Sequence, residues 1–243
     1  MRFVDSHLHL DVQEAEDLVC FAGHAGAVLF ACGVDEKTSA RALELAKASP
    51  EVVKPFVGVH PSEAEKAEGL GWVQAALKSA AGVGEIGLDP TYSGIAGGGH
   101  QMETFTALLE AAQDAGKPVQ VHARKAESKC IEVMGGYKLP KVLLHWLESE
   151  DALPRAMVRG YFVSFGPALL YSKRLQRIAL RADPDLTILE SDFPVPYTPL
   201  GGVAGPMLIP SVAFKLAEVR GEPFKDTLER CAVNSLRYLG EKG

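Results

Sequence analysis

The feature that most limits the fold of this chain is a repeated alternation of short apolar runs with helical segments. The runs are continuously apolar, as expected for strands buried on both faces, and no hairpin signal separates them. After the strand-prone Phe3 and Val4, the predicted strands are Ala27–Cys32, Val52–Val59, Val83–Leu88, Val119–His122, Val142–Leu147, Tyr161–Phe165 and Leu186–Glu190. The predicted helices are Val12–Gly26, Glu36–Ser49, Gly71–Ala81, Gln101–Ala115, Glu127–Tyr137, Ala152–Val158 and Leu170–Arg181, with two more after Pro210.

Strands joined by crossover helices run parallel, so this pattern predicts an α/β fold. About eight strand–helix units in 243 residues favour a (β/α)8 TIM barrel. Barrels of this length form one domain and no shift in composition marks a boundary, so we expect a single domain over residues 1–243. A doubly wound open sheet is the alternative. The Gly-x-Gly-x-x-Gly motif of a dinucleotide-binding sheet does not follow the first strand, which weighs against that alternative.

Composition limits the location and the partners that we expect. No apolar run approaches the roughly 20 residues of a membrane helix, and the first residues lack the pattern of a signal peptide. The four cysteines are scattered without C-x-x-C spacing, which predicts small buried side chains in a reducing cytoplasm. A net charge of −6 argues against a broad cationic surface for duplex nucleic acid, although metal ions would supply local positive charge.

Polar side chains gather at the predicted carboxyl ends of the strands, where the catalytic groups of a parallel barrel lie. His7 and His9 are two residues apart, so an extended backbone places both imidazoles on one face, with Asp5 close enough to orient metal ligands. The other predicted strand ends carry His60, Glu85 with Asp89, His122 with Arg124, His145, and Glu190 with Asp192. Five of the seven histidines are therefore expected at one mouth, and His24 and His100 at the surface or in loops.

Imidazoles and carboxylates without cysteine suit zinc, manganese, iron or nickel, and magnesium is a further candidate. Four histidines and two carboxylates are too many for one catalytic ion with an open position, but they suit two ions roughly 3.5–4 Å apart. We therefore expect two divalent ions, with Glu85 as the bridging ligand. His7, His9 and Asp192 would complete one ligand set, and His122 and His145 the other. Asp192 would also accept a proton from the water that the ions activate.

The order of these motifs resembles that of the TatD-like metal-dependent deoxyribonucleases. The segments that carry the resemblance over nearly the whole chain are D-S-H-L-H-L-D at the start, G-V-H-P at His60, G-E-I-G-L-D at Glu85, V-Q-V-H-A-R at His122 and E-S-D-F-P at Asp192. The resemblance implies an amidohydrolase-like TIM-barrel hydrolase that cleaves phosphodiester bonds with divalent metals. It also implies that the six residues above are metal ligands and that His60 is a substrate-side group near the metals.

Three loops depart from the family pattern. His145 lies in L-L-H-W-L-E-S where a small glycine-containing turn is usual, and P-T-Y-S-G-I-A-G-G-G after Asp89 contains no cation. The last motif continues V-P-Y-T-P-L-G-G-V-A-G instead of a short run to a basic residue. Because these loops shape the substrate mouth, the sequence supports the metal chemistry better than it supports nucleic acid as the substrate.

Three functions remain open at this point. The first is a 3′–5′ exonuclease or related phosphodiesterase on single-stranded nucleic-acid ends, with Asp192, Glu85 and His60 catalytic and with His60 and Arg124 binding the substrate. The second is a hydrolase of a small amide, lactone or phosphoester, which the acidic charge and the missing loop cations favour. The third is a non-enzymatic metal-binding or scaffold protein, although no ligand is missing.

Three further side chains near the predicted mouth have alternative roles. A surface salt bridge is the alternative to phosphate binding for Arg124. Tyr92 is in position to stack on a base, but simple packing is the commoner fate of a loop tyrosine. Trp146, like Trp72, is expected in the core or at the rim.

Overall fold

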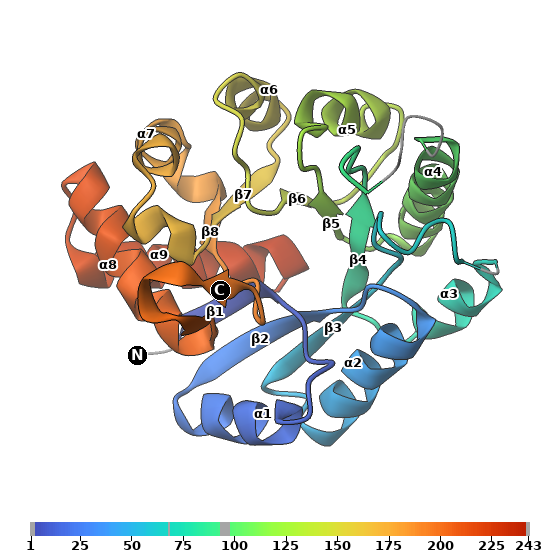
Figure 1. Ribbon diagram of the computed structural model, residues 1–243, viewed down its shortest axis with the longest axis horizontal. Coiled ribbons are helices and arrows are strands. Elements are labelled where there is room, and N and C mark those ends of the chain that lie inside the picture. Colours follow the sequence, from blue (N-terminus) through green and yellow to red (C-terminus); the bar gives the residue numbers. More distant parts are fainter. Residues whose placement is uncertain (1–2, 68, 93–97, 242–243) are drawn as a thin grey trace.

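A computed structural model, which describes residues 3–67, 69–92 and 98–241, forms a ring of eight parallel strands surrounded by helices (Figure 1). The strands follow one another around the ring in sequence order, and each pair from β1/β2 to β7/β8 is parallel. They are β1 (Phe3–Leu8), β2 (Ala27–Cys32), β3 (Val53–Val57), β4 (Gly82–Gly87), β5 (Val119–His122), β6 (Val142–Leu144), β7 (Phe162–Phe165) and β8 (Thr187–Leu189). The predicted TIM barrel is confirmed, and the alternative of a doubly wound sheet is wrong because the strand order never reverses.

Helices follow the strands and cover the outside of the ring. They are α1 (Ala15–His24), α2 (Glu36–Ala48), α3 (Gly71–Ala76), α4 (Gly98–Ala115), α5 (Glu127–Met134), α6 (Ala152–Val158), α7 (Lys173–Arg181), α8 (Ile209–Arg220) and α9 (Phe224–Leu239). Local sequence explains several ends: Asp35 and Thr38 form a capping box at the start of α2, and Gly221 and Gly240 end α8 and α9 in the left-handed conformation. Within the described ranges, no helix has the length and apolar character that a membrane crossing requires.

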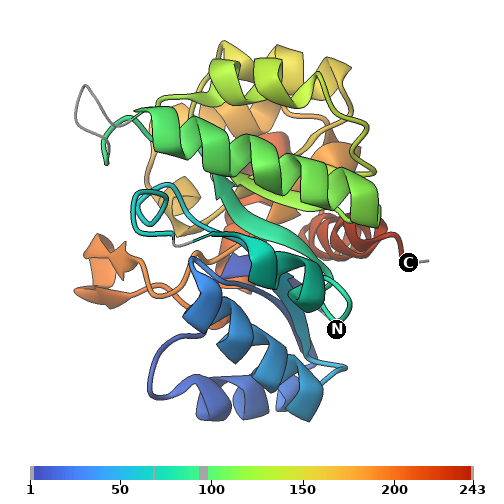
Figure 2. The same cartoon turned by 90° about the vertical axis from the view of Figure 1, so that its right-hand side faces the viewer.

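The segment after β8 contains a small element that the sequence did not predict. Pro196–Tyr197 (β9) and Gly202–Val203 (β10) pair as an antiparallel hairpin, whereas no hairpin signal was recognised in the sequence. Figure 2 shows this orange hairpin projecting beyond the barrel, on the side where the strands end. The hairpin therefore belongs to the walls of the mouth rather than to the ring.

The ring is brought together between β8 and β1 by three hydrogen bonds at the mouth. The backbone N–H of Asp192 donates to the carbonyl of His7 over 3.0 Å, and the N–H of His9 donates to the carbonyl of Phe193 over 2.7 Å. The N–H of Ser191 donates to the carboxylate of Asp5 over 2.8 Å. The segment after β8 is thus fixed against β1, so that Asp192 lies beside the two histidines of the first motif.

An apolar plug fills the barrel below the mouth. Its buried residues are Val4, Val28, Phe30, Cys32, Phe56, Leu143, Phe162, Ile188 and Tyr238. The ring of Tyr238, from α9, packs against Phe30, Phe56 and Phe162 with centroid distances of 5.6–6.4 Å. Because the plug excludes water from below, polar groups directly above it lie in a medium of low polarity, where charges interact strongly.

Two strands are irregular where they carry functional residues. The register of β1 against β2 shifts between Asp5 and Leu8, and that of β4 against β5 shifts between Val83 and Ile86. A regular strand would turn Val4 and His7 to opposite faces, but the shift lets both face the interior. In β4, Gly87 has a φ of 145° and an added Cβ would lie 1.9 Å from the carbonyl oxygen of His122. The second glycine of G-E-I-G-L-D is therefore required for pairing with β5.

Candidate metal centre

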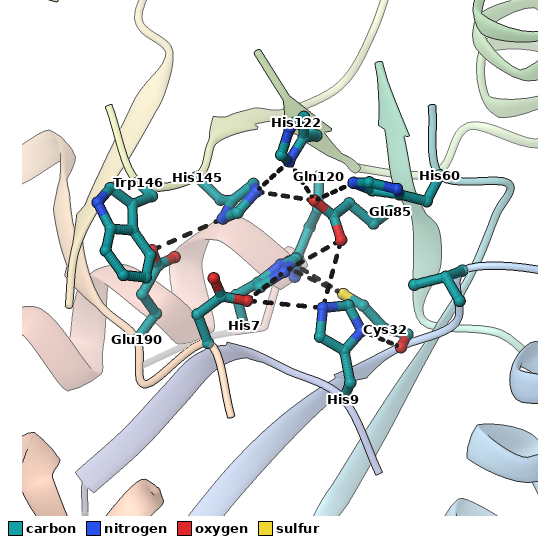
Figure 3. Close-up of polar contacts among 12 residues, drawn as sticks. His7, His9, Cys32, His60, Glu85, Gln120, His122, His145, Trp146 and Glu190 are labelled. Atoms are coloured by element: carbon teal, nitrogen blue, oxygen red, sulfur yellow. Dashed lines mark hydrogen bonds and ion pairs between the residues drawn. The ribbon is translucent and has the colours of Figure 1, made fainter. Parts of the chain in front are cut away.

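Seven of the residues predicted at the strand ends form one cluster at the barrel mouth (Figure 3). They are His7, His9, His60, Glu85, His122, His145 and Asp192. They come from positions 7 to 192 of the chain, and the nearly closed ring of strands brings them within contact distance. His24 and His100 are exposed on helices, as expected for residues outside the site.

The carboxylate of Glu85 divides the cluster into two halves. Its Oε1 lies 2.8 Å from Nδ1 of His122 and 2.8 Å from Nε2 of His145. Its Oε2 lies 3.3 Å from Nε2 of His9 and 3.6 Å from Nε2 of His7. Each oxygen thus faces a different pair of imidazoles, which is the geometry that a bridging carboxylate needs.

Four of the five histidines have one ring nitrogen near a partner outside the cluster. Nδ1 of His7 lies 2.6 Å from the side-chain oxygen of Gln120, and Nδ1 of His9 lies 2.9 Å from the carbonyl oxygen of Cys32. Nε2 of His122 lies 2.9 Å from Asp89, and Nδ1 of His145 lies 3.6 Å from Glu190.

These partners are all acceptors. Those of His7, His9 and His122 lie within hydrogen-bond distance and orient a ring N–H, whereas Glu190 faces Nδ1 of His145 without a hydrogen bond. The opposite nitrogen of each ring faces Glu85 and becomes available to a metal ion once any proton on it is lost. This is how metal-binding histidines are commonly oriented.

His60 differs from the other four histidines. The backbone N–H of Ser62 donates to its Nδ1 over 3.1 Å, and a backbone N–H can only donate. In the neutral imidazole the hydrogen is therefore on Nε2, which points toward Oε1 of Glu85 at 3.7 Å. Although His60, Glu85 and His122 are close enough to hold an ion together, this tautomer makes His60 a hydrogen-bond donor.

Asp192 and Asp5 complete the first half of the cluster. Oδ1 of Asp192 lies 3.6 Å from Nε2 of both His7 and His9, so these three side chains can share one ion. Asp5 was expected to orient metal ligands, but among the described residues it makes no hydrogen bond to the imidazole of His7 or His9. It accepts from the backbone of Ser191 instead, and so fixes the segment that carries Asp192.

The pKa values of the cluster are set by two effects, which are burial and the attraction between the carboxylates and the imidazoles. Burial opposes the charged form of every group. The pKa of Glu85 is nevertheless held well below its usual range by the surrounding imidazoles, His60 first among them. Burial also opposes the His9 cation, but contacts with Asp192 and Glu85 raise its pKa to about 10. Asp89 and Glu85 likewise raise the pKa of His122 against the effect of burial.

For His60, burial prevails and lowers its pKa to about 4, so this imidazole is neutral at pH 7. In contrast, Glu85 and Glu190 overcome burial at His145 and raise its pKa well above the usual range.

The residues present fit a pair of divalent ions. Nε2 of His7 is fully buried and has no hydrogen-bond partner in the described structure, although it faces two carboxylates. An unpaired buried nitrogen is costly unless a ligand meets it. The pKa values of His9, His122 and His145 are raised because the neighbouring carboxylates favour positive charge on these rings. A divalent ion would supply the same positive charge in place of the protons. All the inward donors are nitrogen or carboxylate oxygen, which suits borderline and hard divalent metals.

A cavity of about 350 Å³ opens directly above the metal centre. Its floor includes His122, His145 and Asp192, and its walls are Tyr92, Ala123, Arg124, Glu127, Trp146, Glu148 and Val195. Arg124 lines this cavity and is exposed at its rim, and the surface salt bridge considered as its alternative role is not formed with any residue of the described ranges. Residues 93–97 of the glycine-rich loop after Tyr92 lie outside the described residues.

The supporting acceptors were the part of the site that sequence reasoning missed. Asp89 and Glu190 were placed at strand ends without a role, and Gln120 was not singled out. A signal for Gln120 was present, because a polar residue two positions before His122 in an otherwise apolar buried strand requires a partner inside the barrel. The partner itself, His7, lies 113 positions away and could not be read from the sequence.

A parallel barrel with histidines and carboxylates converging at its mouth defines a metal-dependent hydrolase architecture. The family model described as TatD related DNase matches residues 4–240, so the chain belongs to this family. The human protein named Deoxyribonuclease TATDN3 is 27% identical over 260 residues, covering 97% of this chain and 94% of that protein. The 3'-5' ssDNA/RNA exonuclease TatD of Musicola paradisiaca is 30% identical over 189 residues, covering 71% of this chain and 68% of that protein.

Among solved structures, the fold is similar to that of YJJV, a TatD homologue from Escherichia coli. The TM-score is 0.88 at 24% identity, over 98% of this chain and 97% of that one. The likeness shows that the two chains share the same fold over nearly their whole length.

Proposed function

We propose that this protein is a metal-dependent phosphodiesterase that removes nucleotides from the 3′ ends of single-stranded nucleic acid. The observation that carries the proposal is the position of Glu85, whose two oxygens face separate sets of imidazoles. One divalent ion would be held by His7, His9 and Asp192, and the other by His122 and His145. Glu85 would bind both ions. Bound ions would lower the pKa of a water and offset the negative charge that develops on the phosphate.

The chain's own side chains would divide the remaining tasks among them. The Asp192 carboxylate, at the cavity floor, would accept a proton from the attacking water. His60 would donate its Nε2 hydrogen to a phosphate oxygen, because the Ser62 backbone keeps Nδ1 as an acceptor. Arg124, exposed at the rim, would bind a neighbouring phosphate.

The size of the cavity favours a strand end over a duplex. About 350 Å³ is at the small end of ligand pockets and suits a unit of roughly nucleotide size. With a net charge of −6 and Arg124 as the cation in the cavity wall, few phosphates would be contacted. The logarithm of affinity should therefore fall with the logarithm of salt concentration with a slope of only about one to three. The proposal also includes a cytoplasmic location, which rests on the scattered cysteines.

A hydrolase of a small amide, lactone or phosphoester is the second candidate. The observation in its favour is the acidic wall of the cavity, where Glu127 and Glu148 face the space that a polyanion would enter. Neutral or amino-bearing substrates would enter such a cavity more readily than a strand with several phosphates.

One panel of substrates separates these candidates. The protein would be loaded with manganese, magnesium, zinc or nickel and given a labelled single strand, the matching duplex, a generic phosphodiester and a lactone. We expect cleavage of the single strand from its 3′ end, with the duplex cut more slowly. Cleavage of the lactone alone would reject the nuclease function and leave the metal centre in place.

A second experiment tests the assigned residues. Glu85→Gln and Asp192→Asn keep the shape of each side chain while removing its charge. Each should lower kcat by about 10²–10⁴-fold while far-UV circular dichroism stays unchanged. A chelator should abolish activity, and added manganese or magnesium should restore it. Full activity of Asp192→Asn would show that another group accepts the proton.

A further inference from the structure

The wall of the cavity above the metal centre contains a tryptophan in an unusual backbone conformation. Lys125, Trp146 and Asp192, with φ values of 57°, 45° and 51°, are the non-glycine residues of positive φ in the described ranges. Each follows the end of a barrel strand by two or three positions. For a residue as bulky as tryptophan this conformation is strained, and such strain is kept where the surrounding structure enforces it.

Two contacts hold Trp146 in this conformation. Its backbone N–H donates to the hydroxyl of Ser164 over 3.0 Å, and that hydroxyl donates to Glu190, which is completely buried. Glu190 also faces the metal-centre histidine His145. In Figure 3 the indole and Glu190 are both drawn on the opposite side of the cluster from His60. The backbone of Trp146 is therefore fixed, and its half-buried indole, which packs against the core, forms a wall of the cavity.

The opposite wall of the cavity also carries an aromatic ring. Tyr92 follows β4, Trp146 follows β6, and β5 with His122 lies between them, so the two rings flank the cavity. Tyr92 is 53% exposed and packs edge-on against His60 at a centroid distance of 5.5 Å. A cavity with aromatic side chains on either flank suits a flat ring, because offset stacking on an indole is favourable for any planar base.

The polar groups of the wall indicate which flat ring would be preferred. Glu148 is paired with Arg174 at 2.8 Å, whereas Glu127 is half-buried and has no ion pair with any described residue. An ionised carboxylate only accepts hydrogen bonds, so Glu127 can accept one from a donor group on whatever occupies the cavity. An exocyclic amino group is such a donor, and a ring carbonyl in the same place would be repelled.

We propose that Trp146 and Glu127 form a subsite for the terminal base, in which the indole stacks on the ring and the carboxylate accepts from an exocyclic amino group. This inference rests on the nuclease function proposed above and adds a preference for particular bases at the end of the strand. Strand ends with cytosine or adenine are then preferred over ends with thymine, and base-bearing ends over abasic ones. Both residues determine specificity and neither takes part in the chemical step.

Hydrolysis of strands that differ only in the last nucleotide tests the subsite. The metal-loaded wild type should show a kcat/KM roughly tenfold higher for a terminal dC than for a terminal dT. Glu127→Leu should abolish this preference, and the matched variant Glu148→Leu should keep it, because Glu148 is already paired. Trp146→Ala should lower kcat/KM for base-bearing ends roughly tenfold without affecting an abasic end, and Trp146→Phe should restore most of the loss.

A binding measurement covers the case in which Trp146→Ala does not fold. The chain has two tryptophans, so Trp72→Phe makes Trp146 the only tryptophan, whose emission is excited selectively at wavelengths that the six tyrosines do not absorb. In the metal-loaded protein, dCMP should quench this fluorescence at lower concentration than dTMP, and deoxyribose 5-phosphate should not quench it.

Equal losses for base-bearing and abasic ends, or equal quenching by all three ligands, would overturn the subsite and leave the nuclease function standing. A wild type that cleaves no strand would reject the nuclease function, and with it the proposed specificity.

Discussion

The side-chain oxygen of Gln120 lies 2.6 Å from Nδ1 of His7, across the interior of the barrel. The two residues lie on β5 and β1, which face each other in a ring of eight strands. The same amide donates to the carbonyl of Ser6 over 3.0 Å, which fixes its orientation. Gln120 therefore holds a hydrogen on Nδ1 of His7 and leaves Nε2 free to bind a metal ion.

Gln120→Leu should weaken metal binding by roughly 10–100-fold, because the imidazole of His7 loses the acceptor that sets its tautomer. Gln120→Glu keeps an acceptor at the same place and should retain most of the affinity. Both variants would be titrated with zinc or manganese by isothermal calorimetry. Equal affinity in wild type and Gln120→Leu would show that His7 is oriented by other contacts.

His60→Ala should lose activity without losing metal. The Ser62 N–H makes Nδ1 of His60 an acceptor, so under the proposed function the ring would donate to the substrate, and removing such a donor costs roughly 10²–10³-fold in kcat. Metal content measured by atomic absorption should stay at the wild-type value. His122→Ala is the comparison, since it removes an inward-facing ligand and should lower the content. A fall in metal content in His60→Ala would make His60 a ligand.

Metal binding should release protons and become stronger as pH rises. The carboxylates raise the pKa of His9 to about 10 and that of His145 well above its usual range, so these two rings carry an extra proton at pH 7 in the metal-free protein; the pKa of His122 is raised in the same direction. An incoming ion must displace these protons, so affinity falls as pH falls. Calorimetric titrations in buffers of different ionisation enthalpy would count the protons. An affinity that does not change between pH 6 and 8 would contradict this assignment of charge.

One cysteine of the four should react readily with a thiol reagent at pH 8. The prediction of four buried cysteines is wrong for Cys20, which is exposed, and is confirmed for Cys32, Cys130 and Cys231. Burial raises the pKa of Cys130 and Cys231 to about 12 and that of Cys32 well above its usual value, so little thiolate forms at any of the three. Ellman's reagent should titrate about one thiol in the native protein and four in denaturant. Cys20→Ser should remove the native signal.

The sequence by itself determined the barrel and the position of its chemistry along the chain. Continuous apolar runs such as Ala27–Cys32 are stable only between two covered faces, and helices between them force the strands to be parallel. The carboxyl ends of parallel strands meet at one mouth, so His60, His122 and His145 could be placed together without coordinates. The hairpin after β8 was missed because its strands have only two residues each, too few for a periodic pattern.

Only the tertiary structure decided how these side chains face one another. Which oxygen of Glu85 meets which imidazole, and which nitrogen of His7 or His60 points inward, depends on contacts between segments far apart in the chain. The shifts of register in β1 and β4 and the backbone conformation of Trp146 also depend on contacts with other segments of the barrel. Sequence periodicity fixes the face on which a residue lies, but a hydrogen bond requires distances and angles that are set only when the ring closes.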